Sequence, residues 1–480
     1  MIFSVVVGII FLPISSTKLK IVARGGAMKL TQCFLALLFF NIIFTEASFA
    51  DELSLQEAVL NLQERVSALE KKITEQDVYI ESQNAIMQAQ QQKITEYESK
   101  LSQFDEKLHR EIGRPIQLVE GLEIGVGGTM VIQGTNNVNN ATSDVQKKVS
   151  RTDASYSADI TIGKEFKDVG GKAFLHLEAG QGAGLEDNLT LYSNVNRDAD
   201  NDNNVRLTEF WYEQALLKDK VALTFGKLDP TAYFDQNELA NDETTQFLGR
   251  IFRNSPTIEF PDNGAGIRVA YIPKEWIELG YGLFNAKSSW EKIGDNLFNI
   301  GQVHFKTNFF NLAGNYRFLG WYNNAYHTKW LDESKQKEGV YGFGLSFDQK
   351  VADITTAFLR YGWQDPKVYN PDIKATGDLT YSLEHSWSAG LQVEGKLWGR
   401  ENDVLAFAVG QVFPSDDYKK ADSARRAKAE GHLESYYRIF INDHLSISPD
   451  FQYIWNPFGK DVADDTSDIF VGGIRAQVDF

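Results

Sequence analysis

The sequence predicts an all-β transmembrane barrel of about 16 antiparallel strands, preceded by an α-helical coiled coil. Three observations predict this fold class: an export signal at the N-terminus, a heptad repeat after it, and alternation of apolar and polar residues in the rest of the chain. The C-terminal stretch 468–480 alternates most clearly, with Phe470 and Phe480 on one face of an extended chain and Arg475 on the other. A strand with one apolar and one charged face suits a wall between lipid and water.

Residues 1–50 have the features of a secretory signal region. A short basic start at Met28 is followed by an apolar core, and small residues lead up to Ala50. This order is typical of a signal peptide, so we expect the mature chain to start at Asp51. Met1 and Met28 both stay open as the true start, and we favour Met28 because a separate apolar stretch precedes it.

Residues 51–112 carry a sustained heptad repeat without glycine or proline. A period of 3.5 residues predicts a coiled coil, which we expect to project into the periplasm and to join copies of the chain as a dimer or trimer. The alternative is a single amphipathic helix lying on another surface. Gly113 and Pro115 end the helix, so residues 113–120 are a predicted linker. The predicted core positions are Val59, Leu62, Val66, Leu69, Ile73, Ile80, Ile94, Leu101 and Leu108.

Residues 121–480 form the predicted outer-membrane β-barrel. Short and long connections alternate between its period-2 segments, which is the pattern of periplasmic turns and external loops. A soluble all-β sandwich is the alternative, but it does not account for this alternation. The predicted strands are 122–135, 153–166, 170–181, 206–217, 220–228, 264–272, 276–286, 296–307, 311–323, 339–350, 354–364, 384–398, 403–413, 430–442, 445–456 and 468–480.

The composition excludes several classes of protein. The chain has 48 basic and 65 acidic residues, a net charge of −17, which disfavours nucleic-acid binding because that function needs a basic surface. Its one cysteine, Cys33, lies in the predicted signal, so we expect neither disulfides nor cysteine-ligated metal in the mature chain. The sequence contains no recognisable catalytic motif, and we expect neither an enzyme nor a cofactor.

The long segment 229–263 mixes aromatic residues with charges of both signs. Folded into a wide lumen, such a loop would narrow the pore and line it with acids opposite arginines. Arginine forks and carboxylates also suit the paired donors and acceptors of sugar hydroxyls. The alternative is an external cap with solvated charges. The candidate constriction residues are Lys227, Asp229, Asp235, Glu238, Asp242, Glu243, Arg250 and Arg253.

A second loop contains Asp198, Asp200 and Asp202, which match part of a calcium-loop template. The glycine of that template is replaced by Asn203, and the flanking segments do not have a helical pattern. We therefore expect a solvated surface loop, with calcium as a weak candidate.

Three separate segments carry a resemblance to a known family: Phe210 to Gln214, the long loop, and Gly473 to Phe480. Together they resemble the carbohydrate-selective porin family of the Gram-negative outer membrane, the OprB type, over roughly residues 120–480. The resemblance implies a sixteen-stranded barrel that passes sugars by diffusion, and it implies that Phe480 acts as an assembly signal. The constriction candidates other than Glu238 belong to the family motif, although their individual roles do not follow from it. The coiled coil is not part of this pattern.

We therefore expect a passive porin in the outer membrane, with lipid around it and small hydrophilic solutes, above all carbohydrates, passing through it. Two alternatives stay open. In one, the coiled coil binds peptidoglycan and the chain tethers the outer membrane to the cell wall. In the other, the pore is general or selective for ions.

Overall fold

The computed structural model describes residues 120–139, 150–199, 202–461 and 467–480, together with most residues between 60 and 93. The chain divides into two compact units, Met1–Pro115 and Ile116–Phe480, and each is described by itself.

The described residues of the first unit are helical, as the heptad repeat predicts. At the predicted core positions, Val66, Leu69, Ile73 and Ile80 are each half exposed or more. The pairing of helices that would cover these side chains stays a prediction. The other predicted core residues, Val59, Leu62, Ile94, Leu101 and Leu108, lie outside the described residues. Among the described residues, no helix has the length and apolar character needed to cross a membrane.

The second unit is built almost entirely from long strands. Their bounds are β1 (Leu122–Thr135), β2 (Arg151–Phe166), β3 (Gly171–Gln181), β4 (Arg206–Leu216), β5 (Val221–Leu228), β6 (Gly264–Lys274), β7 (Ile277–Asn285), β8 (Leu297–Phe309), β9 (Leu312–Lys329), β10 (Glu338–Ala352), β11 (Thr355–Gln364), β12 (Val368–Tyr369), β13 (Leu383–Glu394), β14 (Val404–Pro414), β15 (Glu430–Asn442), β16 (Leu445–Trp455) and β17 (Ile469–Asp479).

Short helices lie in the turns and loops between these strands. They are η1 (Lys167–Val169), η2 (Glu186–Asn188), η3 (Pro230–Ala232), α3 (Arg250–Arg253), α4 (Pro371–Ala375), η4 (Leu379–Ser382), η5 (Gly395–Trp398), α5 (Asp416–Ala421) and η6 (Pro457–Lys460).

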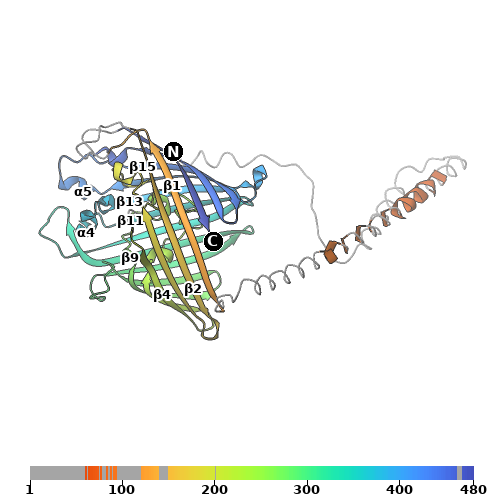
Figure 1. Ribbon diagram of the computed structural model, residues 1–480, viewed down its shortest axis with the longest axis horizontal. Helices are drawn as coiled ribbons and strands as arrows, with labels where there is room; N and C mark the ends of the chain where they lie inside the picture. The colour runs from red at the N-terminus through yellow and green to blue at the C-terminus, as the bar shows by residue number, and fades with distance from the viewer. Residues whose placement is uncertain are drawn as a thin grey trace, which may run out of the picture. The chain divides into compact units, whose positions relative to one another are not determined.

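The strands close into one barrel. Each long strand pairs antiparallel with its neighbours along the chain, and β1 pairs antiparallel with β17, from Gly127 opposite Asp479 to Thr135 opposite Val471. Figure 1 shows β1 in orange beside the blue C-terminal strands. Of the seventeen strands, only the two-residue β12 lies outside the cylinder and pairs with the end of β9. The prediction of sixteen antiparallel strands is confirmed, with most boundaries within a few residues of the expected ones, although β9 ends six residues later than predicted, at Lys329.

The two faces of the wall differ in the way that the alternation predicts. On β1, the side chains of Val126, Met130 and Ile132 are exposed on the outside, whereas Thr129 and Gln133 are buried on the inside. The same division holds around the cylinder, and it leaves an apolar outer band that is stable only against lipid. The inner face carries polar and charged side chains, and these position the long loop.

Candidate pore constriction

The loop 229–263 connects β5 to β6 and packs against the inner face of the barrel. Its apolar residues are buried in two clusters shared with inward-facing wall residues. In one cluster, Phe247 and Phe252 of the loop meet Phe358 and Tyr436 of the wall. Burying one such aromatic side chain contributes about 1.5–3 kcal/mol, so the contacts hold the loop in the lumen. In the second cluster, Phe234 packs against the wall residue Phe284.

A buried ion pair forms the centre of the loop's attachment. The Arg360 Nε atom on β11 lies 3.1 Å from Asp235 Oδ1, and the two side chains are 1% and 0% exposed. Arg360 also donates hydrogen bonds to the carbonyl oxygens of Phe252, Asp235 and Ala240. Because Asp235 is enclosed, the prediction that it faces the solute is wrong. It positions the loop instead.

Two more charged wall residues bind the loop backbone. The Glu434 carboxylate on β15 accepts hydrogen bonds from the Leu248 and Gly249 amides, at 2.6 and 2.9 Å. Arg475 on β17 donates from Nη1 to the carbonyl oxygens of Glu243 and Gln246, both at 2.7 Å. Sequence reasoning missed Arg360 and Glu434 as loop anchors, and it noted Arg475 only as part of a polar face. The sequence feature that could have identified them is a charged residue at an inward-facing position of an otherwise regular strand.

Lys227 departs from its predicted role. It has the same parity on β5 as the exposed, outward-facing Phe225, and its Cα partner on β4 is Phe210, which is also exposed. Its ammonium group donates to the Leu207 carbonyl oxygen. The prediction that Lys227 lines the pore is therefore wrong, because a one-residue step along a strand moves a side chain to the other face.

Most of the remaining candidates lie at the part of the loop that faces open space. The Arg250 Nη1 atom is 2.6 Å from Asp378 Oδ2, and Arg253 forms an ion pair with Glu243, with all four side chains partly exposed. Glu238 is well exposed and lies 3.7 Å from the Arg317 guanidinium.

The two remaining acids shape the loop backbone. Asp229 caps η3 by accepting a hydrogen bond from the Thr231 amide at 2.8 Å, and Asp242 accepts one from the Thr244 amide at 2.8 Å. Neither role requires contact with a solute, although both carboxylates lie near enough to Arg253 to raise the pKa of that guanidinium, while burial lowers it.

The electrostatics of the Arg250–Asp378 pair favour its charged form. Burial on its own raises the pKa of Asp378, but the Arg250 guanidinium and hydrogen bonds from Thr380 outweigh burial and bring the pKa down to about 2. The pair therefore stays ionised at any pH at which the barrel would work, and it ties α3 to the loop that precedes β13.

The loop 182–205, between β3 and β4, also turns inward. Leu185 and Val195 are buried with Ile454 and Val471 of the wall, and Asp198 accepts a hydrogen bond from the inward-facing Ser157 at 3.0 Å. In the Asp/Asn-rich part of this loop, Asn203 and Asn204 are exposed, so the solvated surface loop stays a prediction for that part. Asp200 lies outside the described residues, and within the described ranges no group of three acids or histidines is placed to hold a metal ion, so calcium at Asp198, Asp200 and Asp202 stays an untested prediction.

The inner wall from β2 to β7 carries several partly exposed charged side chains. Its polar side chains are half-buried and paired with one another: His176 lies 2.8 Å from Asp159, and the Arg268 Nη2 atom lies 3.0 Å from Glu278. The Arg268 guanidinium also stands over the ring of Tyr233, 4.6 Å from its centroid. This wall therefore presents charges of both signs and contacts the loop at Tyr233.

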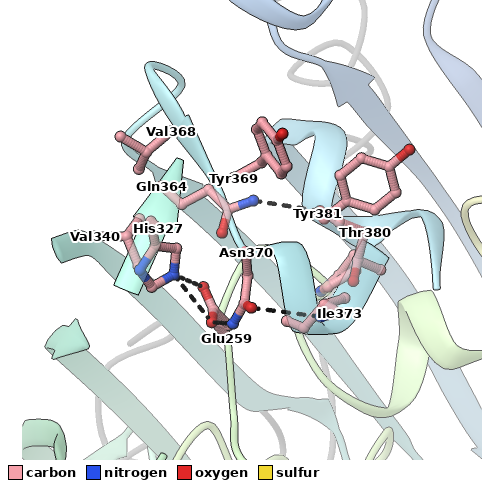
Figure 2. A pocket seen from close by; sticks show the side chains of 11 residues that line it. Glu259, His327, Val340, Gln364, Val368, Tyr369, Asn370, Ile373, Thr380 and Tyr381 are labelled. Carbon is pink, nitrogen blue, oxygen red and sulfur yellow. Dashed lines mark hydrogen bonds and ion pairs between the residues drawn. The ribbon is translucent and has the colours of Figure 1, made fainter. Parts of the chain in front are cut away.

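A small pocket lies where the loop rises towards β6 (Figure 2). There the Glu259 carboxylate lies 3.0 Å from His327 Nε2 and accepts hydrogen bonds from the side-chain amides of Asn323, at 3.0 Å, and Asn370. Because His327 Nδ1 faces the Ala325 carbonyl oxygen at 2.7 Å, both ring nitrogens face acceptors. The contacts of Glu259 thus connect the end of the constriction loop to β9 and to the segment before β13.

The terminal residue completes the barrel wall. The Phe480 amide donates to the Val126 carbonyl oxygen at 2.9 Å, and the Val126 amide donates back at 3.1 Å. Its ring is exposed and stacks on His444, with 5.5 Å between the centroids. Phe480 therefore lies at the seam between the first and last strands, and its role as an assembly signal stays a prediction.

A closed barrel of sixteen antiparallel strands, with a long loop folded against its inner wall, has the architecture of an outer-membrane porin. The family model of the carbohydrate-selective porins, the OprB family, matches residues 153–480, so the chain belongs to that family. An uncharacterized protein of Synechocystis sp. is 22% identical over 328 residues, which cover 61% of this chain and 58% of that protein. The chain thus spans a little over half the length of this relative.

One solved structure supports the fold. The high-pH structure of Pseudomonas putida OprB superposes with a TM-score of 0.64 at 16% identity, covering 76% of this chain and 96% of that one. The low-pH structure of the same protein superposes with a TM-score of 0.46 at 15% identity, over 76% and 94% of the two chains.

Proposed function

We propose that the protein is a passive outer-membrane porin through which small carbohydrates diffuse, with the loop 229–263 as its constriction. The observation that carries this proposal is the anchoring of that loop to the inner wall by Asp235, Arg360, Glu434 and Arg475. A loop fixed across a sixteen-stranded lumen sets the size and charge of the passage. Membership of the carbohydrate-selective family supports the choice of solute, and family and fold are those of a channel rather than an enzyme.

The groups that face the passage suit neutral sugars. Glu238, Glu243, Arg250 and Arg253 are partly exposed, and Arg253 and Glu243 offer a donor and an acceptor side by side. Next to the loop, Trp211 on β4 stacks on Phe174 with 5.0 Å between the centroids and packs against the cluster that contains Phe234. Paired donors and acceptors beside an aromatic face match the hydroxyls and C–H faces of a pyranose. We propose Asp229, Glu238, Asp242, Glu243, Arg250 and Arg253 as the constriction residues.

Single-channel conductance in planar bilayers tests this proposal. Purified protein should insert as stable open channels, and neutral mono- and oligosaccharides should block the current in a saturable manner. Open channels that no sugar blocks would instead support a general or ion-selective pore. A correctly folded barrel that never conducts would support the alternative in which the chain tethers the outer membrane to the cell wall.

We further propose that the heptad segment at 51–112 lies in the periplasm and joins copies of the chain. Support comes from the exposed apolar side chains at Val66, Leu69, Ile73 and Ile80, which repeat at the spacing of a coiled-coil seam. Deleting 51–112 should leave the single-channel conductance unchanged and reduce the oligomer seen by light scattering in detergent. Association of the intact protein with isolated peptidoglycan, lost on deletion, would add the tether role. Loss of conductance itself would contradict a separate role for the two units.

A further inference from the structure

Three arginines from two different loops converge on the loop side of the constriction. Arg250 and Arg253 belong to α3, and Arg197 belongs to the loop between β3 and β4. The loops that carry them meet at Leu248 and Ser193, and the positive charges of Arg250 and Arg253, after burial, lower the pKa of Arg197.

Backbone contacts hold this arrangement without using the guanidinium groups. The Arg197 amide donates to the Leu248 carbonyl oxygen at 2.8 Å, and the Ile251 amide donates to the Ser193 carbonyl oxygen at 3.4 Å. The Glu434 carboxylate fixes the Leu248 and Gly249 amides from the wall. The two loops are therefore joined backbone to backbone, and the arginine side chains are positioned before any solute arrives.

Five acids lie near the arginines, and two of them, Asp229 and Asp242, accept hydrogen bonds from amides of the loop. Asp378 pairs with Arg250, and Glu243 pairs with Arg253. The fifth, Glu186, accepts hydrogen bonds from the Val195 and Asn196 amides at 2.7 and 2.8 Å. Burial raises the pKa of Glu186 to about 7, against the effect of these amides and of nearby arginines, so this carboxyl group is only partly charged at neutral pH.

Arg197 is left with an uncommitted guanidinium. Within the described part of the chain, its side chain makes no hydrogen bond and no ion pair, and the residue is exposed. A guanidinium with free donors, beside two arginines that are paired with Asp378 and Glu243, is suited to bind an anion bidentately.

We propose that Arg197, with Arg250 and Arg253 beside it, binds the anionic group of a charged sugar, a carboxylate or a phosphate, as the sugar passes the constriction. The inference rests on the proposed sugar porin and deepens it, because it names sugar acids and sugar phosphates as solutes that the pore holds more tightly than neutral sugars.

The test compares current block by glucose, gluconate and glucose 6-phosphate in the full-length channel at about 0.1 M salt. At this salt concentration, exposed charges more than ~10 Å apart are largely screened from one another. Both anions should block at lower concentrations than glucose. Arg197→Gln should raise the blocking constant of the anions about three- to fivefold and leave that of glucose unchanged, as expected for one partly solvated charge. Arg197→Lys keeps the charge without the fork and should give an intermediate value. Block by only one of the two anions would keep the proposal and identify the group that is recognised.

The matched control is Arg426→Gln, which removes an exposed arginine from the outer loop after α5. An equal effect from this control would overturn the proposal, because general charge at the pore mouth would then explain the preference. Equal block of the wild type by glucose, gluconate and glucose 6-phosphate would also overturn it while leaving the sugar porin intact. Conducting channels without block by any of the three solutes would contradict the sugar porin itself.

Discussion

Replacing Arg360 by methionine is expected to widen the pore and to raise its single-channel conductance. The substitution keeps most of the side-chain volume but leaves the Asp235 carboxylate buried without its partner, and it removes the donors to Phe252, Asp235 and Ala240. Breaking a buried ion pair from one side costs about 3–5 kcal/mol. The loop, rather than the barrel, should release this strain, because the sheet hydrogen bonds of β11 do not depend on the side chain.

Conductance and limited trypsin digestion together measure that release. Arg250 and Arg253 are tryptic sites within the loop, so a detached loop should be cut there much faster than in the wild type. Arg438→Met on the inner face of β15 is the control, since within the described residues Arg438 makes no hydrogen bond to the loop. The double variant Asp235→Leu/Arg360→Met removes both charges and should recover much of the protection. Unchanged conductance and digestion in Arg360→Met would show that the ion pair does not hold the loop.

Phe247→Ala is expected to destabilise the loop core by about 3–5 kcal/mol, as truncation of a buried phenylalanine does elsewhere. Phe247 is 1% exposed, and its ring contacts Phe252, Phe358 and Tyr436 with centroids 5.0–5.9 Å apart. The cavity that Phe247→Ala would leave lies between the loop and the wall. The loop should therefore become more mobile while the barrel stays closed.

The measurement is noise in the open-channel current together with tryptic cleavage at the loop, and both should increase. Phe470→Ala is the matched control, because Phe470 has the outward parity of β17 and is exposed where lipid would cover it. If Phe470→Ala and Phe247→Ala increase the current noise equally, the contacts of Phe247 do not immobilise the constriction loop.

The strands of the barrel could be predicted because their signals are local. Alternation along β10 or β17, and the contrast between short turns and long loops, can be read without knowing which strands meet. The two-residue β12 escaped prediction because it covers only one period of alternation and so shows no repeat. The helical conformation of the described N-terminal residues followed equally from a local period, while their partners do not follow from it.

The attachment of the loop could not be predicted in the same way. Asp235 and Arg360 are 125 residues apart, and Gly249 and Glu434 are 185 apart, and no local pattern says which of the many charges will meet. We interpreted charged residues in the loop as residues that contact the solute. This interpretation is wrong for Asp235, because its carboxylate pairs with the inward-facing Arg360 and is buried. Lys227 is a different error, since the alternation with Phe225 already indicated its outward direction.

The pairing of β1 with β17 has a consequence for the order of events during biogenesis. Hydrogen bonds such as that between Thr129 and Gln477 join residues 348 positions apart, so the cylinder cannot be completed until the final residues have been synthesised and exported. Until then β1 has an unpaired edge and an apolar face, and such an edge can pair with a strand of another chain. Every secreted copy must therefore spend a period as an open, aggregation-prone chain, and a product that ends before β17 would remain in that state.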